Sequence, residues 1–178
     1  MEWTGEVLDF WFGLADERWW KPDPALDTEI RDRFEELYEE QRQRPADVFL
    51  IDPRTALAAV VLFDQFPRNM YRGHADQFAT DLLALSIAKG AVAREYDQQL
   101  APRERGILYM PFQHSEDLDD QRQSLLLFTE LGDDYQLGFA QKHYDVVARF
   151  GRFPHRNAML GRQPREDEIA AGNVTPFG

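Results

Sequence analysis

The chain has 178 residues, of which 43% are hydrophobic and 29% charged, the composition of an ordinary folded protein of about one domain. Its formal net charge of −12 opposes binding to nucleic acid, and the lack of cysteine excludes disulfides, thiol nucleophiles and thiolate metal sites. The chain has no apolar run near the roughly 18 residues of a membrane span and no signal-peptide pattern, so we expect a cytoplasmic protein without membrane or nucleic-acid partners.

Capping residues, prolines and apolar spacing predict about seven helices and no strand alternation. The helices are expected at residues 4–13, 24–45, 52–67, 80–90, 102–110, 115–132 and 134–151. The third is apolar on every side from 56 to 63, so we expect it to be buried and to end at Pro67. A short helical turn follows Pro154. Residues 162–178 are expected to be a loosely attached tail on a single helical domain, 1–178.

Four prolines at the helix junctions are almost evenly spaced. Prolines 24, 67, 111 and 154 are separated by 43, 44 and 43 residues, and a period of one helix pair in 40 to 47 residues is typical of a helical solenoid. In such a stack the turns at 67, 111 and 154 lie along one edge. The spacing therefore predicts that the polar motifs beside these prolines share a face.

The first polar motif, "DQFPRNMYRG" at 64–73, directly follows the buried helix. Asp64 continues the apolar stripe of that helix, so we expect it to be buried and paired with Arg68, Arg72 or an arginine from another motif. Two interpretations stay open. The motif is either a structural turn, in which Asn69 adopts a left-handed conformation beyond the helix end, or part of a site.

The second motif, "LYMPFQHSED" at 108–117, places a histidine before a predicted helix start. Ser115 is the expected cap, and acidic residues in the first turn favour the helix dipole. His114 either bonds to a backbone carbonyl or serves as a general base or ligand that Glu116 orients.

The third motif, "RFGRFPHRN" at 149–157, repeats part of the first. Arg156 and Asn157 match Arg68 and Asn69, and His155 stands beside them. Two such turns on one edge can present two Arg–Asn pairs to one carboxylate or phosphate, although stabilisation of a helix C-terminus explains the same residues. His74 and His143 fit structural positions better.

Common catalytic motifs are missing from the chain. It has no P-loop, no dinucleotide fingerprint, no nucleophile elbow and no zinc-protease motif. Metal-ligand spacing is also missing, and the arginines near the histidines oppose a cation, so we expect no metal and no cofactor.

Four segments in order, "VLDFWFG", "LFDQFPRNMYRG", "LYMPFQHSED" and "RFGRFPHRNAMLGR", resemble an uncharacterised bacterial family, domain-of-unknown-function family nine-two-four. The resemblance covers nearly the whole chain. It implies an all-α fold, a right-handed array of antiparallel helix pairs in the tetratricopeptide-like helical superfamily. It carries no catalytic role to any residue.

Two functions follow from the residues. The first is a binding module with a groove edged by Arg, Asn and His for a small anionic ligand or acidic peptide, held by Arg68, Asn69, Arg156 and Asn157. Its affinity for anions is expected to rise as the pH falls through about 6.5, where histidine gains a proton. The alternative is a small hydrolase-like enzyme with a base, an orienting acid and an anion-holding arginine. Its expected catalytic residues are Asp64, His114, Glu116 and His155.

Overall fold

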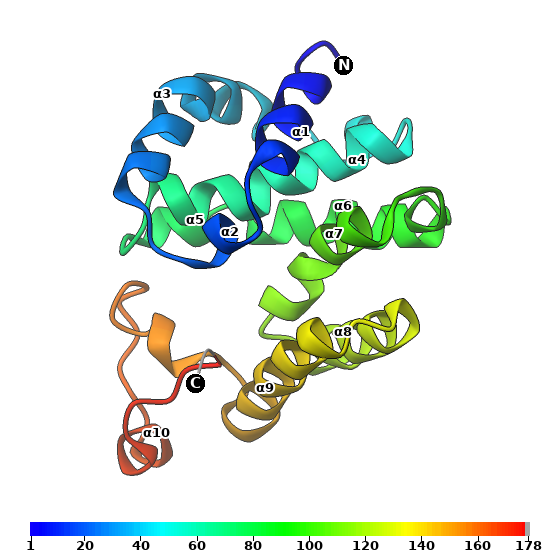
Figure 1. The fold of residues 1–178 in the computed structure, drawn as a ribbon. Helices are drawn as coiled ribbons and strands as arrows, with labels where there is room; N and C mark the ends of the chain where they lie inside the picture. Colours follow the sequence, from blue (N-terminus) through cyan, green and yellow to red (C-terminus); the bar gives the residue numbers. More distant parts are fainter. Residues whose placement is uncertain (177–178) are drawn as a thin grey trace. The chain divides into compact units, whose positions relative to one another are not determined.

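Helices joined by short turns make up residues 1–176, the part of the chain that the computed structural model describes, and no strand occurs within them (Figure 1). The helices are α1 (Trp3–Gly13), α2 (Glu17–Trp20), α3 (Pro24–Gln41), α4 (Pro53–Val60), α5 (Phe66–Met70), α6 (Asp81–Ala93), α7 (Pro102–His114), α8 (Leu118–Leu131), α9 (Asp134–Phe150) and α10 (Glu166–Ala171). The shorter turns are η1 (Ala46–Phe49), η2 (Val61–Gln65), η3 (Ala75–Phe78), η4 (Asp97–Gln99) and η5 (Pro154–Arg156). Within the described residues, no helix has both the length and the apolarity to cross a membrane.

The chain forms two compact units, residues 1–108 and the residues from 109 onward. In the first unit, α4, η2 and α5 form one continuous rod, against which α1, α3 and α6 pack (Figure 1). Residues 56–63 have no solvent exposure, which confirms the predicted buried helix. Asp52 caps this helix by accepting a hydrogen bond of 2.8 Å from the Thr55 N–H, and Pro53 occupies its first turn.

The expectation that Pro67 ends this helix is wrong, because the rod continues through it to Met70. Proline has no N–H, and its ring crowds the carbonyl four residues earlier, which is that of Phe63. The π-helical turn η2 accommodates the ring, and the Thr80 hydroxyl donates to the Phe63 carbonyl at 2.7 Å in place of the missing amide. Asn69 consequently lies inside α5, and its expected left-handed conformation is also wrong: among the described residues, Glu95 is the non-glycine residue with positive φ.

The predicted end of the helix at 102–110 is also wrong, because this helix too continues through a proline. Helix α7 continues through Pro111 to His114. Ser115 is not the cap of the next helix, because the Asp117 carboxylate accepts from the Asp119 and Asp120 amides at 2.9 and 3.1 Å. A longer α7 leaves room for only three residues before α8, so the cap shifts to Asp117.

The second unit is built on the helix pair α8 and α9, which lie side by side (Figure 1). Gly132 and Gly151, with φ of 74° and 67°, end these two helices in the left-handed conformation that glycine adopts most easily. Val146, Val147, Phe150 and Phe153 form a core cluster. The segment expected to be a loose tail contains α10, whose Glu168 is buried.

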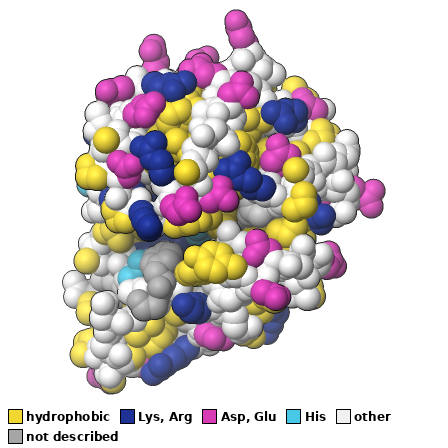
Figure 2. Space-filling view, in the orientation of Figure 1, with side chains coloured by type: hydrophobic (Ala, Val, Ile, Leu, Met, Phe, Trp, Pro, Cys, Tyr) yellow, Lys and Arg dark blue, Asp and Glu magenta, His cyan; other side chains and the backbone are white. Residues whose placement is uncertain are grey.

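Charged side chains of both signs are mixed over the face shown in Figure 2. Asp and Glu side chains stand among the Lys and Arg side chains there, in a chain with a net charge of −12.

Candidate functional site

Asp64 lies in η2 and has no solvent exposure. Its Oδ1 lies 3.3 Å from Nη1 of Arg68, and Gln65 donates to its Oδ2 at 2.6 Å. Arg68 also donates two hydrogen bonds, of 3.0 and 3.1 Å, to Asp81. The predicted burial of Asp64 and its pairing with Arg68 are confirmed.

The Asn69 side chain binds a carboxylate from another helix of the first unit. Its Nδ2 donates to Asp27 of α3 at 2.8 Å, and Arg72 donates two hydrogen bonds of 2.7 and 2.8 Å to the same carboxylate. Asn69 and Arg72 of the first polar motif therefore bind the same carboxylate, that of Asp27. Arg72 does so with the bidentate geometry that guanidinium and carboxylate favour.

Asn157 binds a carboxylate in the same manner in the second unit. Its Nδ2 donates to Glu168 of α10 at 2.9 Å, and Arg152 donates to Glu168 through Nε at 2.6 Å and Nη2 at 2.8 Å. The backbone N–H of Arg165 adds a hydrogen bond of 2.8 Å. Chiefly through the Arg152 hydrogen bond, these donors lower the pKa of Glu168 to about 2, and the carboxylate is only 3% exposed.

Glu116 forms a half-buried ion pair in the same unit. Its two oxygens accept from Arg162 at 2.7 and 3.0 Å, and Oε1 also accepts from the Phe153 N–H at 2.7 Å. Burial raises the pKa of Glu116, but the hydrogen bonds from Arg162 and Phe153 and the charge of Arg162 outweigh it and leave the pKa lowered. Glu116 thus holds the loop after α9, and its expected role in orienting His114 stays a prediction.

Three histidines of the second unit lie near Phe153. The ring centroids of His114 and His143 are 6.2 Å apart, and the Phe153 ring lies 5.5 Å from His143 and 5.7 Å from His155. Arg156 donates to the His114 carbonyl at 3.0 Å, and its guanidinium lies 4.5 Å from the Phe153 ring centroid. The His155 ring therefore lies beside Phe153, whereas His114 contacts the His143 ring and, through its backbone carbonyl, Arg156.

His143 occupies the buried face of α9, as expected, with 2% exposure. Its Nδ1 lies 2.8 Å from the Phe139 carbonyl oxygen. Burial, together with the charges of His114, Arg156 and His155, lowers the pKa of His143 to about 3, so the imidazole is neutral at physiological pH.

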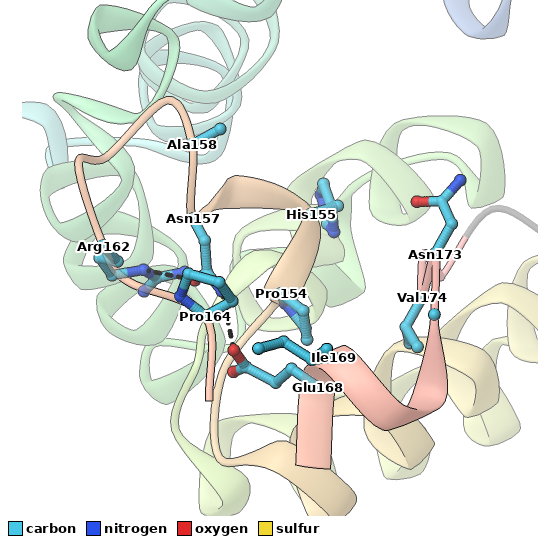
Figure 3. Close-up of a pocket in the computed structure, with 11 residues that line it drawn as sticks. Pro154, His155, Asn157, Ala158, Arg162, Pro164, Glu168, Ile169, Asn173 and Val174 are labelled. Atoms are coloured by element: carbon cyan, nitrogen blue, oxygen red, sulfur yellow. Dashed lines mark hydrogen bonds between the residues drawn. The ribbon is translucent and has the colours of Figure 1, made fainter. Parts of the chain in front are cut away.

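A pocket of about 400 Å³ opens between η5 and α10 (Figure 3). Its polar edge consists of His155, Asn157, Arg162, Glu168 and Asn173. Pro154, Ala158, Pro164, Ile169 and Val174 supply the apolar part of the lining. In Figure 3 the Glu168 carboxylate points from α10 toward Asn157.

The comparisons with known proteins identify a family. The model of a bacterial protein family of unknown function, DUF924, matches residues 7–171. The chain belongs to this family. It is also similar to the solved structure of a protein of unknown function, ATU0120, from Agrobacterium tumefaciens, with 37% sequence identity over 96% of each chain and a TM-score of 0.89. Among curated proteins no similar sequence was found.

The two units of this DUF924 protein divide the predicted site residues. Asp64, Arg68 and Asn69 belong to the first unit, and His114, Glu116, His155, Arg156 and Asn157 belong to the second. That the two sets share one face stays a prediction.

The sequence reasoning missed the partners of these residues. Asp27, Arg152, Arg162 and Glu168 complete the two Asn–Arg arrangements. One signal was available for Glu168: Pro164 and the three acids at 166–168 are typical of a helix start, which predicts an ordered segment instead of a tail.

Proposed function

We propose that this DUF924 protein is a binding module whose second unit takes a small carboxylate- or phosphate-bearing ligand, or the end of an acidic peptide, in the pocket between η5 and α10. The observation that carries the proposal is the pocket itself. A volume of about 400 Å³ with apolar walls and a polar edge of His155, Asn157 and Arg162 matches the usual build of small-molecule sites.

The charge of the surrounding segment supports an anion as the ligand. Residues 149–165 contain five arginines and one histidine and no acidic residue, in a chain with a net charge of −12. Arginine is 17 of the 20 basic residues, and its planar fork matches carboxylate and phosphate oxygens. Arg152 and Arg162 are paired with Glu168 and Glu116, so the excess positive charge of the segment comes from its other three arginines. This excess favours a small anion although the whole chain repels polyanions.

The first unit is a weaker candidate for the ligand. Arg68 and Asn69 already bind the carboxylates of Asp81 and Asp27, so their donors serve the fold. In the second unit His155 and Asn157 line the pocket, and the carboxylate that Asn157 binds belongs to the short helix α10. Arg156 is outside this lining and donates to the His114 carbonyl. We therefore assign ligand contacts to His155 and Asn157 and a structural role to the first polar motif.

A tetratricopeptide-like array of helix pairs is part of the same proposal. The antiparallel pair α8 and α9, joined at Gly132, is one such unit and supports this part of the proposal. Helical arrays of this kind commonly bind ligands and peptides on one face.

The test is thermal stabilisation of the protein by succinate and by phosphate. A ligand at about 100 times its Kd adds about 2.7 kcal/mol of stability, which raises the Tm of a chain of this size by about 5–10 °C. The shift should be larger at pH 6 than at pH 8, and His155→Gln should remove this difference, because a protonated imidazole attracts the anion.

A matched pair of variants locates the binding. Ala158 is exposed and lines the pocket, whereas Ala170 is exposed and does not. Ala158→Phe fills the pocket and should abolish the Tm shift, and Ala170→Phe should leave it unchanged. A full shift in Ala158→Phe would contradict the proposed site.

A hydrolase-like activity is the second candidate, favoured by the ring contacts that connect His114, through His143 and Phe153, to His155. A general base contributes about 10²–10⁴-fold to a rate. With nitrophenyl esters and nitrophenyl phosphate as substrates, an enzyme should lose at least about 100-fold in kcat on His114→Gln or His155→Gln while its Tm is maintained. Hydrolysis that is equal in these variants and in the wild type would contradict this candidate.

A further inference from the structure

We propose that Arg152 and Asn157 form a carboxylate-recognition site that the protein's own Glu168 closes, and that an external organic carboxylate enters by displacing Glu168 and releasing helix α10. The inference rests on the proposed function, for which it names the ligand class and the conformational step. We call this pair of donors the Arg152–Asn157 site.

The geometry of the Arg152–Asn157 site is specific for a carboxylate. Arg152 contacts both oxygens of Glu168, at 2.6 and 2.8 Å, and the Asn157 amide donates to Oε2 at 2.9 Å. A planar fork that meets two coplanar oxygens side by side is the preferred arrangement of guanidinium and carboxylate. The site also lies at the pocket, because both Asn157 and Glu168 line it.

The donors are held in place by bonds that do not depend on α10. Arg162 donates from Nε to the Asn157 Oδ1 at 3.0 Å, and Arg162 is itself bound to Glu116. Arg152 donates from Nη2 to the Gln163 carbonyl at 2.8 Å. We therefore expect the site to stay formed when Glu168 leaves it, which a binding site requires.

Helix α10 itself is lightly attached. It has six residues, of which Glu168 alone is buried, and Ile169 is 65% exposed. Ala171 and, beyond the helix, Val174 add partial apolar contacts to the core cluster of the unit. A short segment with few buried contacts opens locally at low free-energy cost.

The first unit offers the internal contrast. There Asn69 and Arg72 hold Asp27 in nearly the same way, but Asp27 belongs to α3, an 18-residue helix with a buried face. Asp27 cannot leave without the loss of that packing. In the first unit, the donors are therefore occupied by a carboxylate on a firmly packed helix. In the second unit, the matching donors are occupied by a carboxylate on a helix that can be displaced.

Glu168 and an external carboxylate compete for the Arg152–Asn157 site, and this competition limits which ligands can bind. A carboxylate tethered by a short segment acts at an effective concentration on the order of millimolar or above. An external carboxylate must therefore add contacts of its own, and the apolar lining of the pocket, with Pro154 and Pro164, supplies them. The expected ligand is an organic acid whose carbon chain lies against this lining, as the two methylene groups of succinate can.

The experiment compares succinate binding by calorimetry in the full chain and its variants. Glu168→Ala opens the site and should bind succinate at least about tenfold more tightly than the wild type, since the internal competitor is gone. Glu166→Ala, an exposed acid of the same helix, is the matched control and should bind as the wild type does. Arg152→Ala added to Glu168→Ala should abolish the gain.

Hydrogen exchange tests the displacement directly. In the wild type, saturating succinate should speed the exchange of the amides of residues 166–171. Should Glu168→Ala fail to fold, Glu168→Gln keeps the side-chain size without the charge and should show a smaller gain in the same direction. Equal succinate affinity in the wild type and the Glu168 variant, or a gain that survives Arg152→Ala, overturns the inference, and an equal gain for phosphate overturns its assignment to carboxylates.

These outcomes separate the inference from the proposed function. Binding that Ala158→Phe abolishes but that Glu168→Ala does not strengthen supports the pocket and overturns the displacement of Glu168. Arg152-dependent binding that Ala158→Phe leaves intact supports the Arg152–Asn157 site and contradicts the pocket.

Discussion

Asp64 is a fully buried carboxylate whose charge is balanced within its own unit by Arg68. Asp64→Ala leaves that guanidinium with Asp81 alone and removes the acceptor of the buried Gln65 amide, so it should cost about 3 kcal/mol. In a chain of this size the Tm should fall by about 6–12 °C.

The control for Asp64 is an exposed ion pair. Asp119 pairs with Arg122 at 2.6 Å with 86% of its side chain exposed, and exposed pairs contribute little. Asp119→Ala should not measurably change the urea unfolding midpoint. A loss below about half the expected 3 kcal/mol for Asp64→Ala would remove Asp64 from the buried network.

His143 makes the stability of the second unit depend on pH. Its folded pKa is about 3, whereas an unfolded histidine titrates near 6.5, so the unfolded chain binds a proton that the folded chain does not. The stability that neutral His143 provides is complete above pH 6.5 and is lost as the pH falls from there toward 3, by about 2 kcal/mol at pH 5.

His143→Gln should therefore flatten the decline of unfolding free energy between pH 7 and pH 5. The exposed His74 is the matched position, and His74→Gln should keep the wild-type decline. A variant at His143 with the wild-type pH profile would show that another group causes the decline.

At the scale of the helix, Thr80 and Pro67 act as a pair. The Thr80 hydroxyl satisfies the Phe63 carbonyl that Pro67 cannot, at 2.7 Å in a buried position. Thr80→Val should cost about 2 kcal/mol, the cost of a buried carbonyl without a donor. In a Pro67→Ala background the turn can return to the α-helical register, in which the restored amide bonds to the same carbonyl, so Thr80→Val should then cost less than half as much.

The double-mutant cycle measures this coupling from the unfolding free energies of the four proteins. Thr129 makes the same type of bond, to Leu125, on an exposed helix surface, and Thr129→Val should change the stability by less than about 0.5 kcal/mol. Equal costs of Thr80→Val in both backgrounds would contradict the pairing with Pro67.

The sequence predicted those helix starts and ends that depend on a capping residue or a glycine at the boundary itself. Asp52 with Pro53 marks a helix start, and Gly132 and Gly151 mark two helix ends, because each acts through its own cap or φ angle. The helices that pass through Pro67 and Pro111 were not predictable in this way. The donor that rescues the Phe63 carbonyl comes from Thr80, 17 residues later, and only the tertiary structure brings it there.

In the candidate site, too, the sequence predicted what depends on neighbouring residues but not the contacts between distant ones. Burial of Asp64 follows from its place on an apolar stripe, which the residues themselves display. The carboxylates that bind Asn69 and Asn157 lie 42 and 11 residues away along the chain, and no short-range pattern selects Asp27 or Glu168 among the 32 acidic residues. The type of interaction was predictable, but its partners were not.

At the scale of the whole molecule, net charge and local charge have opposite signs. A charge of −12 attracts divalent cations diffusely, and such attraction is screened at 0.15 M salt, where the Debye length is about 8 Å. A bound metal would need several ligands together, and within the described residues no three His, Asp or Glu side chains are grouped in that way. The anion proposed for the second unit rests instead on the arginines of residues 149–165.

We therefore expect a stabilising anion and no stabilising metal ion. In 0.15 M NaCl, EDTA should change the Tm of the purified protein by less than about 1 °C, and zinc or manganese should give no saturable increase, because diffuse attraction does not saturate at low concentration. Succinate under the same conditions should raise the Tm, and EDTA should not reverse the rise. A saturable increase with zinc or manganese that EDTA reverses would contradict the anion site and favour a metal-dependent role for the histidines near Phe153.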